Sequence, residues 1–199
     1  EGRSHLIYHC VACNQGCFDS IFQGQPATCL VNPLAGMEGQ WQVTPTAHPK
    51  KVLVVGGGPA GMKAACTAAE RGHNVSLLEK EDHLGGQAVL NRLIPGREEM
   101  ATAAEDLIQN LKALGVEILT RTEANGDRIR AMAPDAVVLA TGARPSLPPI
   151  AGIEDPRVVQ AWDVLGEDTP TLGRRVVIVG GNAVGLETAL YLAGLGTLS

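Results

Sequence analysis

The sequence predicts an α/β protein with a parallel, doubly wound sheet, and three features of the chain support this fold class. Short apolar runs end in glycines, which is typical of strands that are buried on both faces of a parallel sheet. Stretches with helical patterning separate these runs, so strands and helices alternate along the chain. Glycine is abundant, with 24 residues, and aromatic residues make up only 3%, which suits a fold with many tight turns.

The first strand–helix–strand unit is expected over residues 51–79. Residues 52–55 form a continuous apolar run, which predicts a buried strand. The helix is expected over 59–71, because a proline lies in its first turn and Gly72 lies just past its end. Residues 75–78 then predict the second strand.

The alternation of helices and strands continues towards the C-terminus. A longer helix is expected over about 98–114, with strands at 116–119 and 136–140. Residues 145–155 are rich in proline, and this composition is typical of a linker.

The loop after the first strand has the pattern Gly56-x-Gly58-x-x-Gly61, and Glu79 ends the next strand, 18 residues after Gly61. In a Rossmann-like unit the first glycine permits the tight turn, the second lets the backbone approach a pyrophosphate, and the third lets the helix pack on the strand. The helix N-terminus attracts phosphates, and the acidic residue accepts hydrogen bonds from ribose. The sequence therefore predicts a dinucleotide site. The alternative is a structural glycine turn followed by a solvated Glu79.

Two later segments favour FAD over a nicotinamide at this loop. The sequences GGGPAG, EK with LGGQ, and ATGARP together resemble the FAD domain of the two-dinucleotide flavoprotein reductases. In that family the LGG segment runs beside the cofactor, and the ATG turn brings backbone close to it. The ATG turn alone fits an ordinary strand end equally well. The resemblance implies that the cofactor contacts are Gly56, Gly58, Pro59, Ala60, Gly61, Glu79, Lys80, Gly86, Gln87, Ala140, Thr141 and Gly142.

Four of the five cysteines lie in the first 48 residues with the spacing C-x2-C-x3-C-x11-C. We expect a cytoplasmic protein, since no signal-peptide pattern and no membrane-length apolar run is found. In that compartment clustered cysteines favour a metal over disulfides. Three close cysteines and a distant fourth favour a [4Fe–4S] cluster, with structural zinc as the alternative. The expected ligands are Cys10, Cys13, Cys17 and Cys29, whereas Cys66 is expected in the core.

The residues around these cysteines closely resemble one family's cluster segment, through HCVACNQGC and then TCLVNP. This family comprises the 2,4-dienoyl-CoA reductases, enoate reductases and trimethylamine dehydrogenases, which are multidomain relatives of old yellow enzyme. In them an N-terminal (β/α)8 barrel carries FMN and the substrate. The resemblance implies a cluster segment at 1–48, an FAD-binding domain at 49–156 without its C-terminal part, and the beginning of an NAD(P)H-binding domain at 157–199.

The order of strand, glycine loop and helix returns near the C-terminus, with the strand expected at 175–179 and the helix at 186–193. The loop between them, with Gly180 and Gly185, resembles the family's NAD(P)H-binding turn but has Asn182 in place of the middle glycine. A side chain there crowds the pyrophosphate, although asparagine tolerates left-handed backbone angles. We expect either weakened nucleotide binding or a purely structural turn in this second Rossmann-like unit.

The resemblance implies the electron-input part of an NAD(P)H-dependent flavin and iron–sulfur oxidoreductase. Electrons would pass from NAD(P)H through FAD and the cluster to FMN in the protein's own barrel domain, which reduces an activated C=C bond of dienoyl-CoA or enoate type. The amine dehydrogenase branch is the alternative, with ADP in place of FAD and electrons leaving to an electron-transfer flavoprotein. A third interpretation is a zinc-binding module on a degenerate scaffold without a redox role.

Composition limits the other functional classes. The net charge of −5 gives no reason to expect a nucleic acid or an anionic membrane as partner, and a homo-oligomer is compatible with the sequence. No acid, base or nucleophile for substrate chemistry stands out. Both ends of the sequence suggest a fragment, which we expect to show no turnover by itself.

Overall fold

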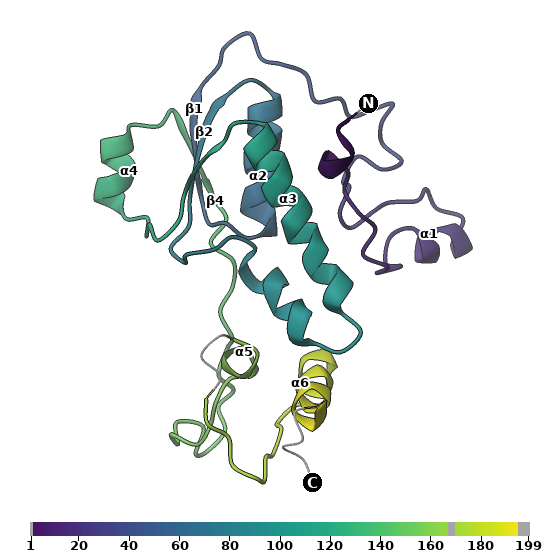
Figure 1. Ribbon diagram of the computed structural model, residues 1–199, viewed down its shortest axis with the longest axis vertical. Helices are drawn as coiled ribbons and strands as arrows, with labels where there is room; N and C mark the ends of the chain where they lie inside the picture. Colours follow the sequence, from purple (N-terminus) through teal and green to yellow (C-terminus); the bar gives the residue numbers. More distant parts are fainter. Residues whose placement is uncertain (1, 167–169, 195–199) are drawn as a thin grey trace. The chain divides into compact units, whose positions relative to one another are not determined.

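The computed structural model describes residues 2–166 and 170–194, and the chain divides into two compact units (Figure 1). The first, here called the sheet unit, comprises Glu1–Val89 and Glu99–Gly142. The second, here called the C-terminal unit, comprises Leu90–Glu98 and Ala143–Ser199.

A four-stranded parallel sheet organises the sheet unit, in the order β3-β2-β1-β4. The central strand β1 pairs with β2 on one side and with β4 on the other. In open α/β sheets ligands bind beyond the carboxyl ends of the strands, where the strand order reverses. The loop that follows β1 lies at this position. The strands are β1 (Lys51–Val55), β2 (Asn74–Leu78), β3 (Glu117–Leu119) and β4 (Ala136–Leu139).

Helices cover both faces of the sheet. Helices α2 (Pro59–Glu70) and α3 (Thr102–Ala113) lie side by side on one face, and α4 (Gly126–Met132) lies on the other (Figure 1). On the first face, Met62 of α2 and Leu111 of α3 are fully buried in the larger core cluster. On the second face, Ile129 and Met132 pack against a smaller cluster of buried strand residues. The doubly wound α/β prediction is confirmed.

Helix α4 is present in the structure but was not predicted from the sequence. Its N-cap is Asn125, whose side-chain Oδ1 accepts a hydrogen bond from the backbone N–H of Arg128 at 2.9 Å. Asn-Gly is also a strong turn signal, and seven residues give too short a periodic pattern to reveal a helix.

The helix expected at 98–114 begins as a 3-10 turn. The remaining short helices are η1 (Ser4–Leu6), α1 (Phe18–Phe22), η2 (Gly86–Leu93) and η3 (Glu98–Ala101).

The C-terminal unit differs from the predicted strand–loop–helix repeat in one element. Helices α5 (Ala161–Val164) and α6 (Ala183–Gly194) are present, but the strand expected at 175–179 is not formed. A strand needs a neighbour to satisfy its backbone groups, and the described part of this unit has no other strand. Val177 and Val179 accordingly remain 87% and 74% exposed. The proline-rich segment 145–155 has neither helix nor strand, as predicted.

No helix in the described part of the chain is both long enough and apolar enough to cross a bilayer.

Removing a buried leucine from α3 tests the larger core. We expect Leu111→Ala to lower the free energy of unfolding by about 2–5 kcal/mol, because it leaves a cavity where Leu111 is now 0% exposed. Gln109→Ala, at an exposed position of the same helix, serves as the control and should change it by less than about 0.5 kcal/mol. Urea unfolding followed by far-ultraviolet circular dichroism measures both. Equal effects of the two substitutions would contradict this core assignment.

Candidate functional site

Two of the glycines in the loop after β1 are required by the fold itself. Gly56 has a φ of +108°, and a Cβ atom on it would collide with the carbonyl oxygen of Ala140. A Cβ atom on Gly61 would collide with the carbonyl oxygen of Gly56. These contacts press the first turn of α2 against the ends of β1 and β4. Substitution at either position must therefore disturb the local structure.

Gly58 is different, because nothing in the fold requires a glycine there. It is the N-cap of α2 with a φ of −73°, which any residue adopts, and a Cβ atom would have no heavy atom within 4 Å. The absence of a side chain leaves open space over the first N–H groups of α2. Open space over a helix N-terminus suits a phosphate that approaches the backbone closely.

Glu79 lies directly after β2 and is only 8% exposed. Its Oε2 accepts a hydrogen bond from the backbone N–H of Gly57 at 2.6 Å, and its Oε1 accepts one from the backbone N–H of Glu81 at 2.9 Å. The burial of this carboxylate is thus compensated by two backbone donors. Each carboxylate oxygen keeps a further lone pair, so Glu79 can still accept hydrogen bonds from ribose hydroxyls.

The other predicted contact segments gather around the same loop. The backbone N–H of Gly85 donates to the carbonyl oxygen of Gly57 at 2.9 Å, and a Cβ atom on Gly86 would lie 3.1 Å from the Cα of Gly58. The backbone N–H of Ala140 donates to the carbonyl oxygen of Val55 at 2.8 Å, which places 140–142 at the carboxyl end of β4.

The remaining predicted contacts of the first loop lie at its edges. Pro59 and Ala60 open α2 and are exposed, as are Thr141 and Gly142. A Cβ atom on Gly142 would lie 3.7 Å from the Nε2 of Gln87, so these two segments are adjacent. Lys80 is 65% exposed and forms an ion pair with Glu81 at 3.1 Å.

The second glycine loop repeats the steric arrangement of the first. Gly180 has a φ of +116°, and a Cβ atom on Gly185 would collide with the carbonyl oxygen of Gly180. Asn182 is exposed just before α6, and its carbonyl oxygen accepts the backbone N–H of Leu186 at 3.0 Å. The turn therefore forms with a side chain at the middle position.

Residues 2–48 contain the four clustered cysteines and are here called the cysteine segment. The backbone of this segment is folded back on itself. The N–H of Thr28 donates to the carbonyl oxygen of Gly16 at 3.3 Å, which brings the residue before Cys29 beside the residue before Cys17. The N–H of Ala12 donates to the Sγ of Cys10 at 3.4 Å. Ala12 and Asn14 have φ values of 50° and 54°, so the chain turns tightly between the first cysteines.

The four cysteines of this segment differ in exposure. Cys10 and Cys17 are exposed, and Cys13 and Cys29 are half-buried. Among the described residues, no three His, Cys, Asp or Glu side chains form a group that could hold a metal ion. Cysteine sulfur is nevertheless the ligand that a soft metal prefers, and the N–H donated to the Sγ of Cys10 is the kind of hydrogen bond that supports such a ligand. The chemistry of the segment therefore fits such a centre.

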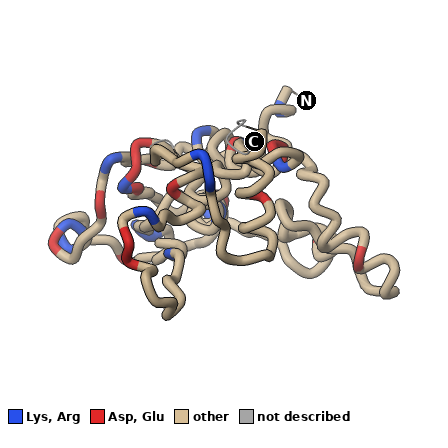
Figure 2. The backbone as a smooth tube through the Cα atoms, turned by 90° about the horizontal axis from the view of Figure 1, so that it is seen from below, with Lys and Arg blue, Asp and Glu red and all other residues tan. Residues whose placement is uncertain are grey.

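The cysteine segment carries little charge and several exposed apolar side chains. Between residues 4 and 37, Asp19 is the sole formally charged residue in the sequence. Figure 2 shows that long stretches of the tube carry no charged residue, while charged residues of both signs occur elsewhere. The exposed apolar side chains are Ile7, Phe18, Ile21, Phe22, Leu30 and Trp41. Exposed apolar side chains in this number suit an interaction surface.

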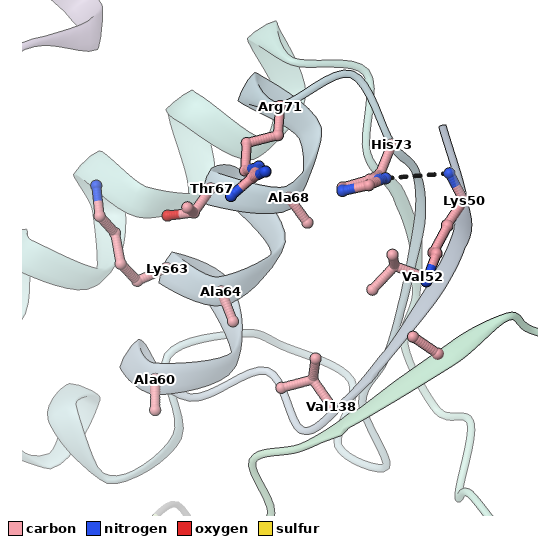
Figure 3. A pocket seen from close by; sticks show the side chains of 11 residues that line it. Lys50, Val52, Ala60, Lys63, Ala64, Thr67, Ala68, Arg71, His73 and Val138 are labelled. Atoms are coloured by element: carbon pink, nitrogen blue, oxygen red, sulfur yellow. Dashed lines mark hydrogen bonds between the residues drawn. The ribbon is translucent and has the colours of Figure 1, made fainter. Parts of the chain in front are cut away.

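A separate hollow of about 650 Å³ lies between α2 and β4 (Figure 3). Basic side chains surround it, and a hydrogen bond joins two of the lining residues, from the backbone N–H of Lys50 to the Nδ1 of His73 at 3.0 Å. Val138 of the edge strand β4 lines its wall and is 36% exposed. Of the predicted site residues it includes Ala60 alone, so this hollow is distinct from the glycine loop.

The fifth cysteine, Cys66, is buried in α2 as predicted, with 0% exposure. Burial raises the pKa of its thiol to about 11, and Glu70 adds to the increase. A thiol with this pKa is protonated at neutral pH and is a poor nucleophile. Cys66 therefore belongs to the core and not to the cysteine segment.

Comparisons with known proteins give consistent results. The family model for pyridine nucleotide-disulphide oxidoreductases matches residues 50–198. A metal reductase of Desulforamulus reducens is 44% identical over 100% of this chain, and an NADH oxidase of Thermoanaerobacter brockii is 46% identical over 97% of it. The solved structure of a 2-naphthoyl-CoA reductase in complex with 2-naphthoyl-CoA superposes on 98% of the chain with a TM-score of 0.93 and 42% identity. The chain spans about 30% of the length of each of these proteins.

The raised pKa of Cys66 predicts that its thiol reacts slowly with alkylating reagents. In protein freed of metal, iodoacetamide should alkylate exposed Cys10 and Cys17 at neutral pH at least about 100-fold faster than Cys66, because burial lowers both the thiolate fraction and the access of Cys66. Mass spectrometry of peptides over a time course measures the rates. Unfolding in urea should remove the difference, and equal rates in the folded protein would contradict the core assignment.

Proposed function

The chain belongs to the pyridine nucleotide-disulphide oxidoreductase family, and from that premise we propose that it is the electron-input part of a larger NAD(P)H-dependent flavoprotein. In this proposal the loop 56–61 holds the pyrophosphate of FAD at the N-terminus of α2, and Glu79 holds its ribose. One observation carries the proposal: Gly58 is a position where the fold itself tolerates a side chain but the site has none. When bound, FAD takes up electrons as hydride and passes them on singly.

The residues of this chain have distinct tasks in the proposed site. The N–H groups at the start of α2 would face the phosphates, and Glu79 is already oriented by the N–H groups of Gly57 and Glu81. The backbone would approach the cofactor closely in the rest of the loop and in the segments that border it. They include Pro59, Ala60, Gly86, Gln87, Ala140, Thr141 and Gly142, with Lys80 at the edge.

We propose that the cysteine segment holds a [4Fe–4S] cluster through Cys10, Cys13, Cys17 and Cys29. The spacing supports iron–sulfur over zinc, and the N–H of Ala12 that is donated to the Sγ of Cys10 supports a thiolate ligand there. The hydrogen bond between Thr28 and Gly16 supports closure of the segment around a common centre. The cluster would carry electrons singly, away from the nucleotide site.

The parts of the proposed function that involve other domains rest on the family resemblance. NAD(P)H would bind at the second loop through Gly180, Asn182 and Gly185, within an NAD(P)H-binding domain that begins at about residue 157. FMN would be bound in the protein's own (β/α)8 barrel domain, where an activated C=C bond of the substrate would be reduced. The exposed apolar side chains of the cysteine segment support its contact with such a domain.

Asn182 favours one second candidate, the amine dehydrogenase branch, because a side chain at the middle position weakens a nicotinamide site. In that branch the loop 56–61 would hold ADP, and electrons would leave the cluster to an electron-transfer flavoprotein. Extraction of the bound nucleotide separates the two candidates, since FAD is yellow and ADP is colourless.

Substitution of Gly58 tests the proposed FAD site directly. Gly58→Ala should leave the fold intact but lower FAD content by about tenfold or more, because the new Cβ would occupy the space reserved for the pyrophosphate. Gly39→Ala is the matched control, since Gly39 also has open space and lies outside the loop. Circular dichroism measures folding, and extraction with the visible spectrum measures FAD. A Gly58→Ala protein that keeps its full flavin content would refute the proposed site.

Metal analysis tests the proposed cluster. Protein purified without oxygen should contain about four irons and about four acid-labile sulfides per chain. Cys17→Ala should lose most of both because it removes a ligand, whereas Cys66→Ala should keep them because Cys66 lies in the core. About one zinc per chain and no labile sulfide would establish the zinc-binding alternative instead.

A further inference from the structure

Asp106 is a buried carboxylate that the proposed function leaves without a role. It lies on α3 and is 6% exposed, and both of its oxygens are used by a single residue 97 positions away in the sequence. The backbone N–H of His9 donates to its Oδ2 at 2.6 Å, and the Nδ1 of His9 lies 2.8 Å from its Oδ1. Both contacts are short, so the carboxyl group of Asp106 joins the backbone and the ring of the same residue.

Other contacts bind the same stretch of chain to the sheet unit. The Nδ2 of Asn110, one helical turn after Asp106, donates to the carbonyl oxygen of Leu6 at 3.2 Å and to that of Asp106 at 2.8 Å. Tyr8 packs against the larger core cluster, and the Nζ of Lys63 donates to its hydroxyl at 3.2 Å. The chain is thus held at several successive residues directly before Cys10.

Helix α3 also contacts the proposed FAD site. A Cβ atom on Gly85 would lie 3.3 Å from the Cβ of Ala104, so α3 borders the segment that hydrogen-bonds to the glycine loop. Ala104 and Asp106 are two residues apart. One short stretch of α3 therefore contacts the edge of the nucleotide site and the residue before the first cysteine.

Energetics favour a positioning role for Asp106 over a merely stabilising one. Only the carboxylate of this contact is buried, because the His9 side chain is 63% exposed. Burying a carboxylate costs desolvation energy that its hydrogen bonds must offset, so the contact adds little to the stability of the fold. What the carboxylate adds is geometry, because two short hydrogen bonds fix both the backbone and the ring of His9. This restricts the position of Cys10 relative to α3.

We propose that Asp106 is the positioning residue of the cysteine segment, fixing His9, and with it Cys10, to the helix that borders the glycine loop. As far as the cluster is concerned, this inference rests on the proposed function. It assigns to α3 the task of keeping the distance between the nucleotide site and the first cysteine constant.

Hydrogen–deuterium exchange of the purified holoprotein tests the contact itself. Asp106→Asn keeps the size of the side chain but replaces one acceptor by a donor, so peptides that cover residues 6–13 should exchange about tenfold faster. Peptides that cover 51–62 should be unchanged. His9→Ala, which keeps the backbone hydrogen bond and removes the ring, should have a smaller effect. Glu105→Gln removes an exposed carboxylate from the same helix and is the matched control.

The cluster provides a second readout that loss of stability alone would not move. In Asp106→Asn the reduction potential of the iron–sulfur chromophore should shift, and FAD content should stay at the wild-type level. Unchanged exchange over residues 6–13 overturns the proposal whether or not iron is present. Faster exchange that extends to 51–62 with loss of flavin also overturns it, because Asp106 would then serve the whole fold. A wild-type protein without iron overturns the proposed cluster, while the exchange data still decide the role of Asp106.

Discussion

The hydrogen bond from the backbone N–H of Gly57 to the Oε2 of Glu79 is the constraint on which the arrangement of the sheet unit depends. It is 2.6 Å long and buried, and it joins the loop after β1 to the end of β2. The backbone of Glu79 continues this connection, because its N–H donates to the carbonyl oxygen of Leu119 and its carbonyl oxygen accepts the N–H of Thr122. One residue thereby ties together the carboxyl ends of three adjacent strands. Any ligand bound at this edge of the sheet meets a surface that these hydrogen bonds already hold in place.

Local patterns were enough to predict the elements that build this edge. The apolar runs of β1 and β2, and the proline and glycine that bound α2, are signals within a few residues of one another. The strand expected at 175–179 shows the limit of the same reasoning, because strand formation depends on a neighbouring strand as well as on apolar residues. Helix α4 shows the opposite limit, since its packing against Leu53, Val55 and Leu78 outweighs a sequence that resembles a turn.

The candidate site residues also differ in whether a local sequence pattern points to them. The glycine pattern and Glu79 could be found because their spacing reflects the geometry of one strand–turn–helix unit. The cysteine spacing likewise predicts a kind of ligand, but it does not describe how the segment is held. Asp106 has no local signal at all: an aspartate on a helix normally faces solvent, and its partner His9 lies far away in the sequence. Such contacts become visible once the tertiary structure is known.

The two glycine loops allow a comparison within one molecule. Gly56 and Gly61 make the same steric contact as Gly180 and Gly185, so the outer glycines serve the turn in both loops. At the middle position one loop has Gly58 and the other has Asn182, and the turn forms in both. The middle glycine is therefore not needed for the turn, and its presence at position 58 requires another reason. The proposed phosphate, close to the backbone at the start of α2, would supply that reason, and it would separate what a ligand requires from what the fold requires.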